Sequence, residues 1–459
     1  MRPYTALCAN ILFPLHERLK GHDTVARRGW LEQTQWWSAE RIEALRLERL
    51  RDFLGQAGAS VPYYRRLFAE RRFDPAALDS LDGLAALPLL TKADIRAHLE
   101  DMKAEGHGPL SRYNTGGSSG EPLVFFMGRS RKSHDVAAKW RATRWWDVDI
   151  GDRELVIWGS PIELGAQDRV RVLRDRLMRS RLLPAFEMSE ANLTRFVEAI
   201  RAMRPAMLFG YPSCLSLIAE HARTRGVRLD DLGTRAAFVT SEKLYDEQRE
   251  SIATAFGCRV ANGYGARDAG FIAHECPAGS MHISAEDIIV ETVRRDGSRC
   301  AAGEAGEIVI THMATPEFPF VRYRTGDVGV LSDAPCACGR GLPVLQEVQG
   351  RTTDFVVARD GTVMHGLALI YTVRDLQGVE RFRIVQESLD RTEVLLVTNA
   401  AFDPAAEARI VHDFRARLGP QVDVVIRKVD DIPPERSGKF RYVISKVAGR
   451  ELMEAMTHA

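Results

Sequence analysis

The sequence has almost no net charge and no long hydrophobic run. Its 459 residues include 63 Lys and Arg and 62 Asp and Glu, for a formal net charge of +1. A chain with this balance has no overall field to attract nucleic acid or anionic lipid. Its apolar runs also stay well short of the roughly 20 residues that a membrane-spanning helix needs. We therefore expect small-molecule partners, no nucleic acid and no transmembrane segment, and the oligomeric state stays open.

Cysteine is scarce, and its number is odd. The seven cysteines are spread along the chain at positions 8, 214, 258, 276, 300, 336 and 338. A disulfide framework uses paired cysteines at close spacing in a short secreted chain. The distribution therefore predicts free thiols in a reducing compartment, and we expect a cytoplasmic protein.

The first residues have only weak features of an export signal. Met1-Arg2 is followed by apolar residues from Leu7 to Leu15, but Pro14 and nearby charges interrupt the run. A clear small-residue cleavage site is also missing. We expect a packed helix in this segment.

Short apolar runs alternate with longer amphipathic segments through most of the chain. The runs at 154–158, 206–209, 236–239 and 259–261 are typical of buried strands, and 212–225 and 245–256 of helices between them. Further strands are expected at 307–310 and 355–357. This alternation predicts an α/β fold with mainly parallel sheets. The length and the 45% hydrophobic content suit a large domain plus a smaller one.

The pattern changes after residue 350. Strands are expected at 382–385, 393–397 and 422–426, with one helix at about 404–418. A small α+β domain fits this segment. We therefore predict a large N-terminal domain at 1–350 and a smaller C-terminal domain at 351–459.

A loop rich in Gly, Ser and Thr follows residue 113. Its sequence is Tyr113-Asn114-Thr115-Gly116-Gly117-Ser118-Ser119-Gly120-Glu121-Pro122. Such a loop can turn several backbone N–H groups and hydroxyls toward one polyphosphate. It lacks the lysine of a P-loop, so an ordinary P-loop NTPase is a poor fit. Taken alone, a loop of this composition is more often a flexible connection.

Four further segments accompany this loop, in a fixed order. They are Asn262-Gly263-Tyr264-Gly265-Ala266-Arg267-Asp268, Tyr323-Arg324-Thr325-Gly326-Asp327, Gly350-Arg351-Thr352-Thr353-Asp354 and Arg436-Ser437-Gly438-Lys439-Phe440-Arg441. Each alone is common turn chemistry. Together, over about residues 60–450, they resemble the adenylate-forming superfamily of acyl-CoA synthetases. The Glu-Pro after the loop and the segment Thr240-Ser241-Glu242-Lys243-Leu244 resemble its phenylacetate-coenzyme A ligase and capsule-polysaccharide branch.

The resemblance implies an N-terminal AMP-binding domain at 1–350, which holds a nucleotide site, and a mobile C-terminal domain at 351–459. Thr115, Gly116, Gly117, Ser118, Ser119 and Gly120 would hold the β- and γ-phosphates of ATP. Tyr264 and Gly265 would lie at the adenine, and Ser241, Glu242 and Lys243 would line its pocket. Asp327 and Arg351 would bind the ribose. Asp268 would help to hold Mg²⁺, which prefers hard oxygen ligands, although the family usually has Glu at this position.

The resemblance also implies a moving catalytic lysine. Lys439 would bridge the acyl carboxylate and the α-phosphate during adenylation, and an ammonium on a long flexible stem suits such a contact. The C-terminal domain would turn between an adenylation pose and a thioester-forming pose. Thr353 stands at the hinge, where the family usually has Asp or Lys.

A second set of residues has the chemistry of a metal centre. Cys276 and His282 are separated by five residues, and Cys336 and Cys338 by one. Thiolates and an imidazole from two loops could form a closed tetrahedral zinc site. His274 is a competing ligand, and reduced loop cysteines are the plain alternative. Some members of the family branch carry such a site, so we expect a structural zinc ion.

The arginines between residues 169 and 181 stand out in this otherwise balanced chain. Val170, Leu173 and Leu177 occur between them at helical spacing. The pattern is typical of a solvated helix face. Contact with coenzyme A phosphates or with a membrane surface is the alternative.

These features favour an ATP-dependent carboxylate–coenzyme A ligase that acts on an aryl or arylacetic acid such as phenylacetate. A second hypothesis is an adenylate-forming enzyme of envelope or capsular polysaccharide biosynthesis. It would pass the acyl group or AMP to an amine or hydroxyl. A third is a nucleotide-binding regulator without turnover, but Asp327, Arg351 and Lys439 together favour an enzyme. The motifs do not name the acid.

Overall fold

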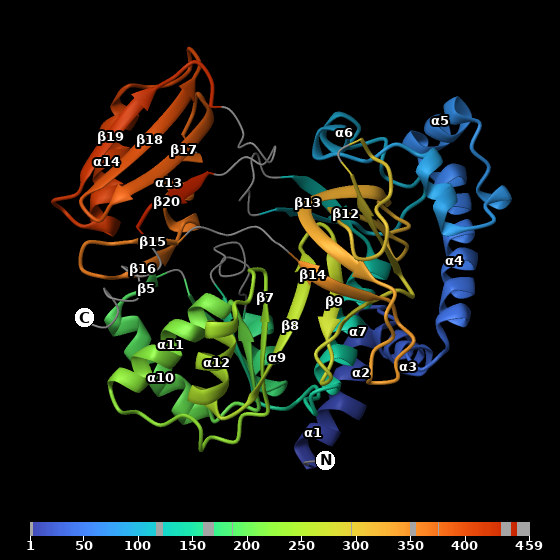
Figure 1. The fold of residues 1–459 in the computed structure, drawn as a ribbon, viewed down its shortest axis with the longest axis horizontal. Coiled ribbons are helices and arrows are strands. Elements are labelled where there is room, and N and C mark those ends of the chain that lie inside the picture. The colour runs from blue at the N-terminus through green and yellow to red at the C-terminus, as the bar shows by residue number, and fades with distance from the viewer. Residues whose placement is uncertain are drawn as a thin grey trace.

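The structure of the protein is a computed structural model. This structure describes residues 3–115, 123–158, 169–185, 187–294, 296–348, 355–374, 376–432 and 442–447. Figure 1 shows a large twisted sheet with helices around it, and a smaller sheet near the C-terminal end of the chain. The predicted α/β class is confirmed.

The large sheet has 11 strands in the order β11-β12-β13-β14-β10-β9-β8-β7-β6-β3-β4. Its parallel part consists of β3 (Glu154–Trp158), β4 (Ser180–Pro184), β6 (Met207–Gly210), β7 (Ala236–Thr240) and β8 (Arg259–Ala266). The four strands predicted between residues 154 and 261 are all found in this part. The predicted helices between them are α11 (Pro212–Thr224) and α12 (Asp246–Phe256).

Helices cover both faces of the parallel part. Leu208 and Val239 pack against α10 (Glu190–Met203), α11 and α12, whereas Phe209 and Phe238 pack on the other face, toward α7 (Arg129–Arg144). Burial on both faces explains why β6 and β7 are continuous apolar runs rather than alternating ones.

The other part of the large sheet is antiparallel. It contains β9 (Gly270–Glu275), β10 (Met281–Ile283), β11 (Ile288–Val293), β12 (Ala305–His312), β13 (Phe320–Ser332) and β14 (Val344–Val348). The sheet is thus mixed, whereas the sequence pattern predicted mainly parallel sheets. Consecutive strands here are joined by loops of 4 to 11 residues, whereas parallel strands need a longer crossover connection, usually a helix.

Further helices pack around the antiparallel part. Residues of α4 (Ala39–Ser60) and α5 (Pro62–Arg71) share one hydrophobic core with β9–β13, and α3 (Thr24–Thr34) packs against α7. A hairpin of β1 (Ser111–Asn114) and β2 (Val124–Met127) flanks the predicted phosphate loop. The short helical pieces η2 (Pro75–Ala77), η3 (Leu81–Ala86) and α6 (Lys92–Ala97) lie between α5 and this hairpin in sequence.

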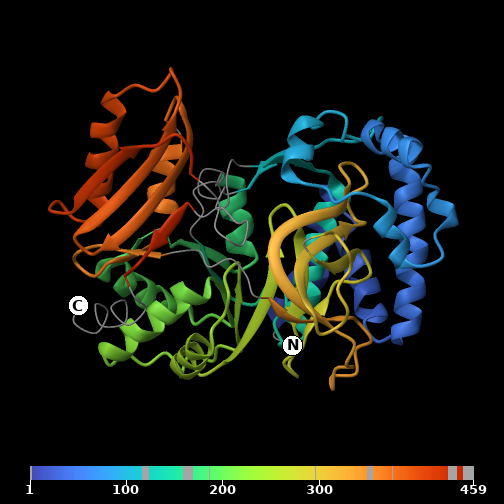
Figure 2. The same cartoon turned by 45° about the horizontal axis from the view of Figure 1, so that its top comes forward.

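The smaller sheet has four strands, in the order β19-β18-β17-β20. Its strands are β17 (Val379–Ser388), β18 (Arg391–Thr398), β19 (Asp423–Lys428) and β20 (Val443–Ser445), and α13 (Leu367–Arg374) and α14 (Ala405–Leu418) complete its core. Figure 2 shows this orange and red unit to one side of the large sheet. A separate three-stranded sheet joins β15 (Phe355–Val357) and β16 (Val363–His365) to β5 (Glu187–Met188). A smaller C-terminal unit is thus present, while the boundary at residue 350 and the mobility stay predictions.

The N-terminal segment is helical, as predicted. It consists of α1 (Pro3–Leu7), the π-helical turn η1 (Cys8–Leu12) and α2 (Phe13–Leu19). The arginine-rich stretch forms α9 (Arg169–Leu177). None of the helices in the described residues is both long and apolar enough to cross a membrane.

Candidate functional site

Two of the predicted nucleotide motifs meet on neighbouring parts of the large sheet. Tyr264 lies on β8, and Asp327 lies on β13. The Tyr264 hydroxyl donates to Oδ2 of Asp327 at 3.0 Å and lies 3.4 Å from Oγ1 of Thr325. The predicted adenine and ribose residues are therefore adjacent in space, although 63 positions separate them in the chain.

A second hydrogen bond joins the same two motifs, but here the motif on β13 supplies the donor and the motif after β8 supplies the acceptor. Asp268 is buried in the turn between β8 and β9, and its Oδ2 accepts a hydrogen bond from the hydroxyl of Tyr323 on β13. Each motif therefore supplies one tyrosine and one aspartate to the pair. The crossed hydrogen bonds fix the carboxylates of Asp268 and Asp327 relative to each other.

The turn that carries Asp268 is held from beneath by α7. Arg131 is buried, and its guanidinium donates to the backbone carbonyls of Asp268 and Arg267, both at 3.3 Å. The Arg267 guanidinium in turn donates to the carbonyl of Asn114, at the end of β1, at 3.4 Å. The turn is thus tied both to α7 and to the hairpin before the predicted phosphate loop.

Gly265 and Gly270 permit this tight turn. A Cβ atom on Gly265 would lie 2.4 Å from the carbonyl oxygen of Gly270. Gly270 has φ +92° and would place a Cβ 2.8 Å from Nε2 of His312. A side chain at either position would displace the segment that carries Asp268.

The predicted adenine-pocket segment lies directly after β7. Ser241 has φ 75°, an uncommon left-handed conformation for a residue other than glycine. Oε2 of Glu242 accepts a hydrogen bond from the backbone N–H of Ser213, at the start of α11, at 3.4 Å. Burial raises the pKa of Glu242 to about 7. Lys243 lies 3.7 Å from Glu347 on β14. The segment therefore lies at the carboxyl end of a parallel strand, where α/β sheets commonly bind ligands.

The structure describes only part of the predicted phosphate, ribose and catalytic groups. Thr115 closes the base of the loop, because its backbone N–H donates to Leu123 at 3.0 Å and its hydroxyl accepts from the Leu123 N–H at 2.9 Å. Gly116, Gly117, Ser118, Ser119, Gly120, Arg351 and Lys439 lie outside the described residues.

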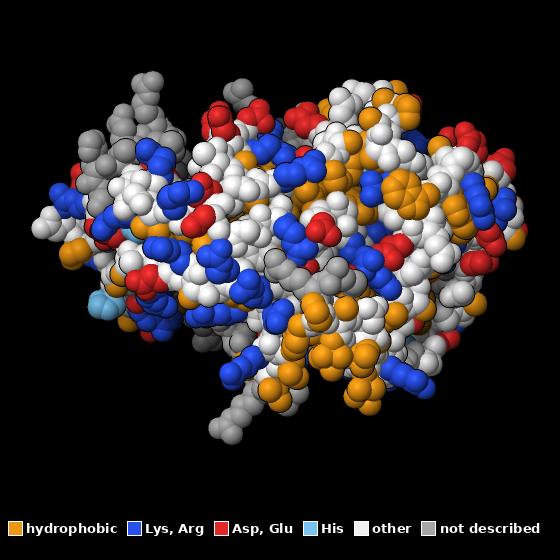
Figure 3. Space-filling view, turned by 90° about the horizontal axis from the view of Figure 1, so that it is seen from below, with side chains coloured by type: hydrophobic (Ala, Val, Ile, Leu, Met, Phe, Trp, Pro, Cys, Tyr) orange, Lys and Arg blue, Asp and Glu red, His pale blue; other side chains and the backbone are white. Residues whose placement is uncertain are grey.

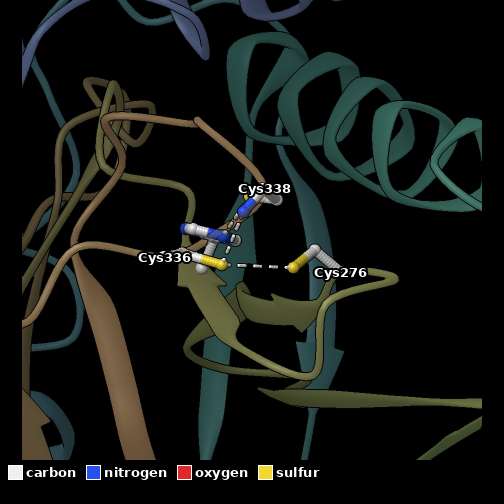
Figure 4. Close-up of side chains that lie close together, drawn as sticks. Cys276, Cys336 and Cys338 are labelled. Atoms are coloured by element: carbon white, nitrogen blue, oxygen red, sulfur yellow. Dashed lines mark hydrogen bonds between the residues drawn. The ribbon is translucent and has the colours of Figure 1, made fainter.

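The four predicted zinc ligands come together. Cys276, His282, Cys336 and Cys338 each offer one atom, and these atoms lie within 4.8 Å of one another. Sγ of Cys276 is 3.7 Å from Sγ of Cys336, and Nε2 of His282 is 3.2 Å from Sγ of Cys338. Figure 4 shows the three cysteines converging from two loops. Two thiolates about 2.3 Å from one tetrahedral ion would be about 3.8 Å apart, so the spacing fits zinc.

The imidazole in this cluster is oriented for metal binding. Nδ1 of His282 lies 3.1 Å from the carbonyl oxygen of Leu342, which leaves Nε2 toward the sulfur atoms. Burial lowers the pKa of His282 to about 4, so the ring is neutral near pH 7, as a ligand must be. His274, the competing candidate, is not in the cluster.

A buried charged network beneath the site had no signal in the sequence. The Nε–H of Arg131 is shared between the two carboxylate oxygens of Asp135, at 3.0 and 2.9 Å, and Asp135 lies beside the rings of His134 and His312. Burial opposes ionisation of Asp135, but the guanidinium and the two rings hold its pKa well below its usual value. Burial lowers the pKa of His312 to about 3. Arg131 already supplies the positive charge here, so a metal ion fits this trio poorly.

Known proteins are similar to this chain in sequence and in fold. The family described as the CapK C-terminal domain matches residues 356–446. Protein CapK of Staphylococcus aureus is 22% identical over 407 residues, covering 88% of this chain and 89% of that protein. A phenylacetate-coenzyme A ligase of Thermus thermophilus is 24% identical over 436 residues, covering 88% and 96%. One of Pseudomonas putida is 27% identical over 350 residues, covering 74% and 76%.

The chain is similar to the phenylacetate-coenzyme A ligases and to Protein CapK over most of its length. The resemblance drawn from the motifs is thus confirmed. A crystal structure of 2-hydroxyisobutyryl-CoA ligase, in complex with 2-HIB-AMP and CoA in the thioesterification state, matches with a TM-score of 0.63 at 22% identity. The match covers 93% of this chain and 94% of that one. A second structure of that ligase, in the postadenylation state with 2-HIB-AMP, has a TM-score of 0.59 at 21% identity. These likenesses support the fold across both units.

Proposed function

We propose that this protein is an AMP-forming carboxylate–coenzyme A ligase. In the first half-reaction a carboxylate oxygen attacks the α-phosphorus of ATP and pyrophosphate leaves. In the second, the thiol sulfur of coenzyme A attacks the acyl carbon, and AMP leaves as the thioester forms. An aryl or arylacetic acid is the proposed substrate, since relatives with up to 27% identity are phenylacetate-coenzyme A ligases.

The crossed pair of hydrogen bonds between the two motifs is the observation that carries this proposal. Tyr264 reaches Asp327, and Tyr323 reaches Asp268. A hydrogen-bonded Asp327 is poised to accept from both ribose hydroxyls, while Asp268 lies on the adjoining turn. In this arrangement the Asp327 carboxylate would bind the sugar, and the Asp268 carboxylate would face a phosphate-bound cation.

The remaining roles follow the family resemblance. Thr115 and Gly116–Gly120 would hold the terminal phosphates, Arg351 would support the ribose, and Lys439 would neutralise the charge that develops at the α-phosphate. Mg²⁺ would neutralise phosphate charge when bound. Asp268 is shorter than the usual glutamate and already accepts a hydrogen bond from Tyr323. Its role would be to orient the cation's water ligands.

We also propose a structural zinc ion in the Cys276–His282–Cys336–Cys338 cluster. Four protein ligands leave no open position for substrate, so the ion would stabilise rather than react. It would fasten the loop between β13 and β14 to the turn between β9 and β10. That attachment would support β13, which carries Asp327.

A second candidate function uses the same first half-reaction. The CapK C-terminal domain match at residues 356–446 and the similarity to Protein CapK support transfer of the acyl group, or of AMP, to an amine or hydroxyl. On either proposal the catalytic cycle would use an N-terminal AMP-binding domain at 1–350 and a mobile C-terminal domain at 351–459. The protein would act in the cytoplasm, where ATP is supplied.

A screen of carboxylic acids tests the proposal. Purified protein with MgATP is expected to release pyrophosphate with an aryl or arylacetic acid, and to form a thioester only when coenzyme A is added. Asp327→Ala provides the inactive control. Pyrophosphate release with no thioester would favour the second function. No release with any acid would favour a regulator and contradict both.

A further inference from the structure

An exposed apolar surface lies on two helical segments that the proposed chemistry does not use. Its seven side chains are Leu7, Ile11, Leu15 and Leu19 on α1–η1–α2 and Val172, Leu173 and Leu177 on α9. Each is between 40% and 81% exposed. We call this surface the apolar ridge.

The ridge holds most of the exposed large hydrophobic side chains. The structure shows ten such side chains among the residues that it describes, and seven of them belong to the ridge. The other three are Trp36, Val136 and Tyr245. Isolated exposed apolar residues are ordinary, but a concentration of them marks an interaction site.

The two segments of the ridge are firmly attached to each other and to the core. The hydroxyl of Tyr4 donates to the carbonyl of Leu177 at 2.8 Å. Phe13 is buried against Trp140, with the ring centroids 5.1 Å apart, and Met178 packs beside them. Both segments therefore have a buried side that fixes them and an exposed side that is apolar.

The helical spacing explains why the apolar residues point outward together. Leu7, Ile11, Leu15 and Leu19 are four residues apart, and side chains at this spacing share one face of a helix. The opposite face carries Cys8, which is buried. An amphipathic helix normally turns its apolar face to the core, whereas this one has apolar residues on both faces.

The border of the ridge is basic, although the whole chain is nearly neutral. Residues 169–181 contain six arginines and one aspartate. Arg18, Lys20, Arg176 and Arg181 lie within four residues of ridge side chains in the sequence and are exposed. Glu17, by contrast, is buried, and its Oε2 lies 3.0 Å from Nδ1 of His22. Figure 3 shows the face on which the N terminus lies in Figure 1, with hydrophobic side chains gathered at its lower centre and Lys and Arg beside them.

We propose that the apolar ridge binds the surface of an anionic membrane. Leucine, isoleucine and valine side chains would enter the boundary between headgroups and acyl chains, while the basic border contacts anionic headgroups. Long arginine side chains suit this position because their stems are apolar and their heads charged. A second copy of the chain fits less well, because a two-fold contact through the ridge would bring the two basic borders together.

Vesicle co-sedimentation of the full-length protein tests this proposal. We expect binding to phosphatidylcholine vesicles that contain phosphatidylglycerol, and much weaker binding to phosphatidylcholine alone. High salt should weaken the binding, because it screens exposed charges. The double variant Ile11→Glu/Leu15→Glu should reduce binding by at least about tenfold. Trp36→Glu, which changes an exposed apolar residue outside the ridge, should bind like the native protein.

If the Ile11→Glu/Leu15→Glu variant fails to fold, a charge variant still tests membrane binding by the ridge. Arg176→Glu should also weaken binding to anionic vesicles, whereas Arg409→Glu, an exposed arginine on α14, should not. Equal binding by native protein and ridge variants would overturn the proposal, as would no binding to any vesicle. Size-exclusion chromatography with light scattering measures the oligomeric state, and so tests whether the ridge joins two copies of the chain instead. A dimer that the ridge variants disrupt, without vesicle binding, would assign the ridge to self-association.

Discussion

At the scale of single residues, the site depends on side chains that hold other side chains in place. Tyr264 and Tyr323 each donate to an aspartate of the other motif. A hydrogen bond to a charged group contributes about 1.5–3 kcal/mol, more than one between neutral groups. We infer that the two tyrosine hydroxyls fix the directions in which Asp327 and Asp268 face a nucleotide.

Tyr264→Phe tests this role while keeping the aromatic ring. Loss of the hydroxyl should release Asp327 and raise the Kd for ATP by about tenfold, because about 1.4 kcal/mol corresponds to a factor of ten. Titration calorimetry with ATP measures the change. Tyr63→Phe, on α5, is the matched control and should bind ATP normally. Unchanged affinity in Tyr264→Phe would show that the hydrogen bond does not position the ribose ligand.

Arg131 acts from below the site and was absent from the sequence-based hypothesis. It pairs with Asp135 and also holds the turn that carries Asp268. Removing one partner of a buried ion pair leaves the other charge uncompensated, so Arg131→Ala should lower the free energy of unfolding by about 3–5 kcal/mol. Urea unfolding provides the measurement. Arg65→Ala, which breaks the exposed Arg65–Glu105 pair, should cost about 1 kcal/mol or less. Equal losses in the two variants would contradict the structural role of Arg131.

At the scale of elements, the sequence predicted strands and helices better than it predicted their pairing. The continuous apolar runs of β6 and β7 were clear because both faces of these strands are buried. The antiparallel pairing of β9–β14 was not predicted, because strand direction depends on which runs are joined by short turns. The sequence predicted no role for Tyr323 by itself, because its hydrogen bond to Asp268 depends on the fold that brings β13 beside the turn between β8 and β9.

The grouping of Cys276 with His282 and of Cys336 with Cys338 was predictable because each pair is close in sequence. Their convergence depends on the pairing of β10 with both β9 and β14, which brings the two loops together. By contrast, His312 meets the adjacent residues His134 and Asp135 only through tertiary packing, and no motif links it to them. The apolar ridge was not predicted for the same reason, because its two helical segments are about 150 residues apart in sequence and meet only in the fold.

Metal analysis tests the zinc centre. Protein purified without added metal should contain about one zinc ion per chain. The Cys336→Ser/Cys338→Ser variant should lose the ion and unfold at a lower temperature, whereas Cys258→Ser, outside the cluster, should keep it. Zinc retained at native level after both cysteines are changed would exclude this ligand set.

At the scale of the whole molecule, the proposed cycle needs the small C-terminal unit to serve two half-reactions. Its four-stranded sheet has a core of its own with α13 and α14. β16, by contrast, pairs with β5 of the N-terminal part, and β15 pairs with β16. A unit with its own core can move as a body when the segment before it changes conformation. The motif order predicted such a unit.

Lys439→Ala tests the two-pose cycle. Adenylation should slow by about 10² to 10³, since one electrostatic contact to the α-phosphate is lost. Thioester formation from supplied acyl adenylate should change little, because Lys439 would be distant in that pose. Lys446→Ala, which removes an exposed lysine of the same unit, is the control. Equal loss in both half-reactions would indicate general damage to the domain, and normal adenylation would remove Lys439 from the mechanism.

Product stoichiometry with the acid that gives the fastest turnover tests the central claim most directly. Native protein supplied with MgATP, the acid and coenzyme A should form AMP, pyrophosphate and acyl thioester in equal amounts. The ratio can be followed by chromatography of the nucleotides and thioesters together with an enzymatic assay for pyrophosphate. Equal amounts of the three products would support an AMP-forming acid–thiol ligase. ADP and phosphate in place of AMP and pyrophosphate, or AMP formed with no thioester, would contradict it.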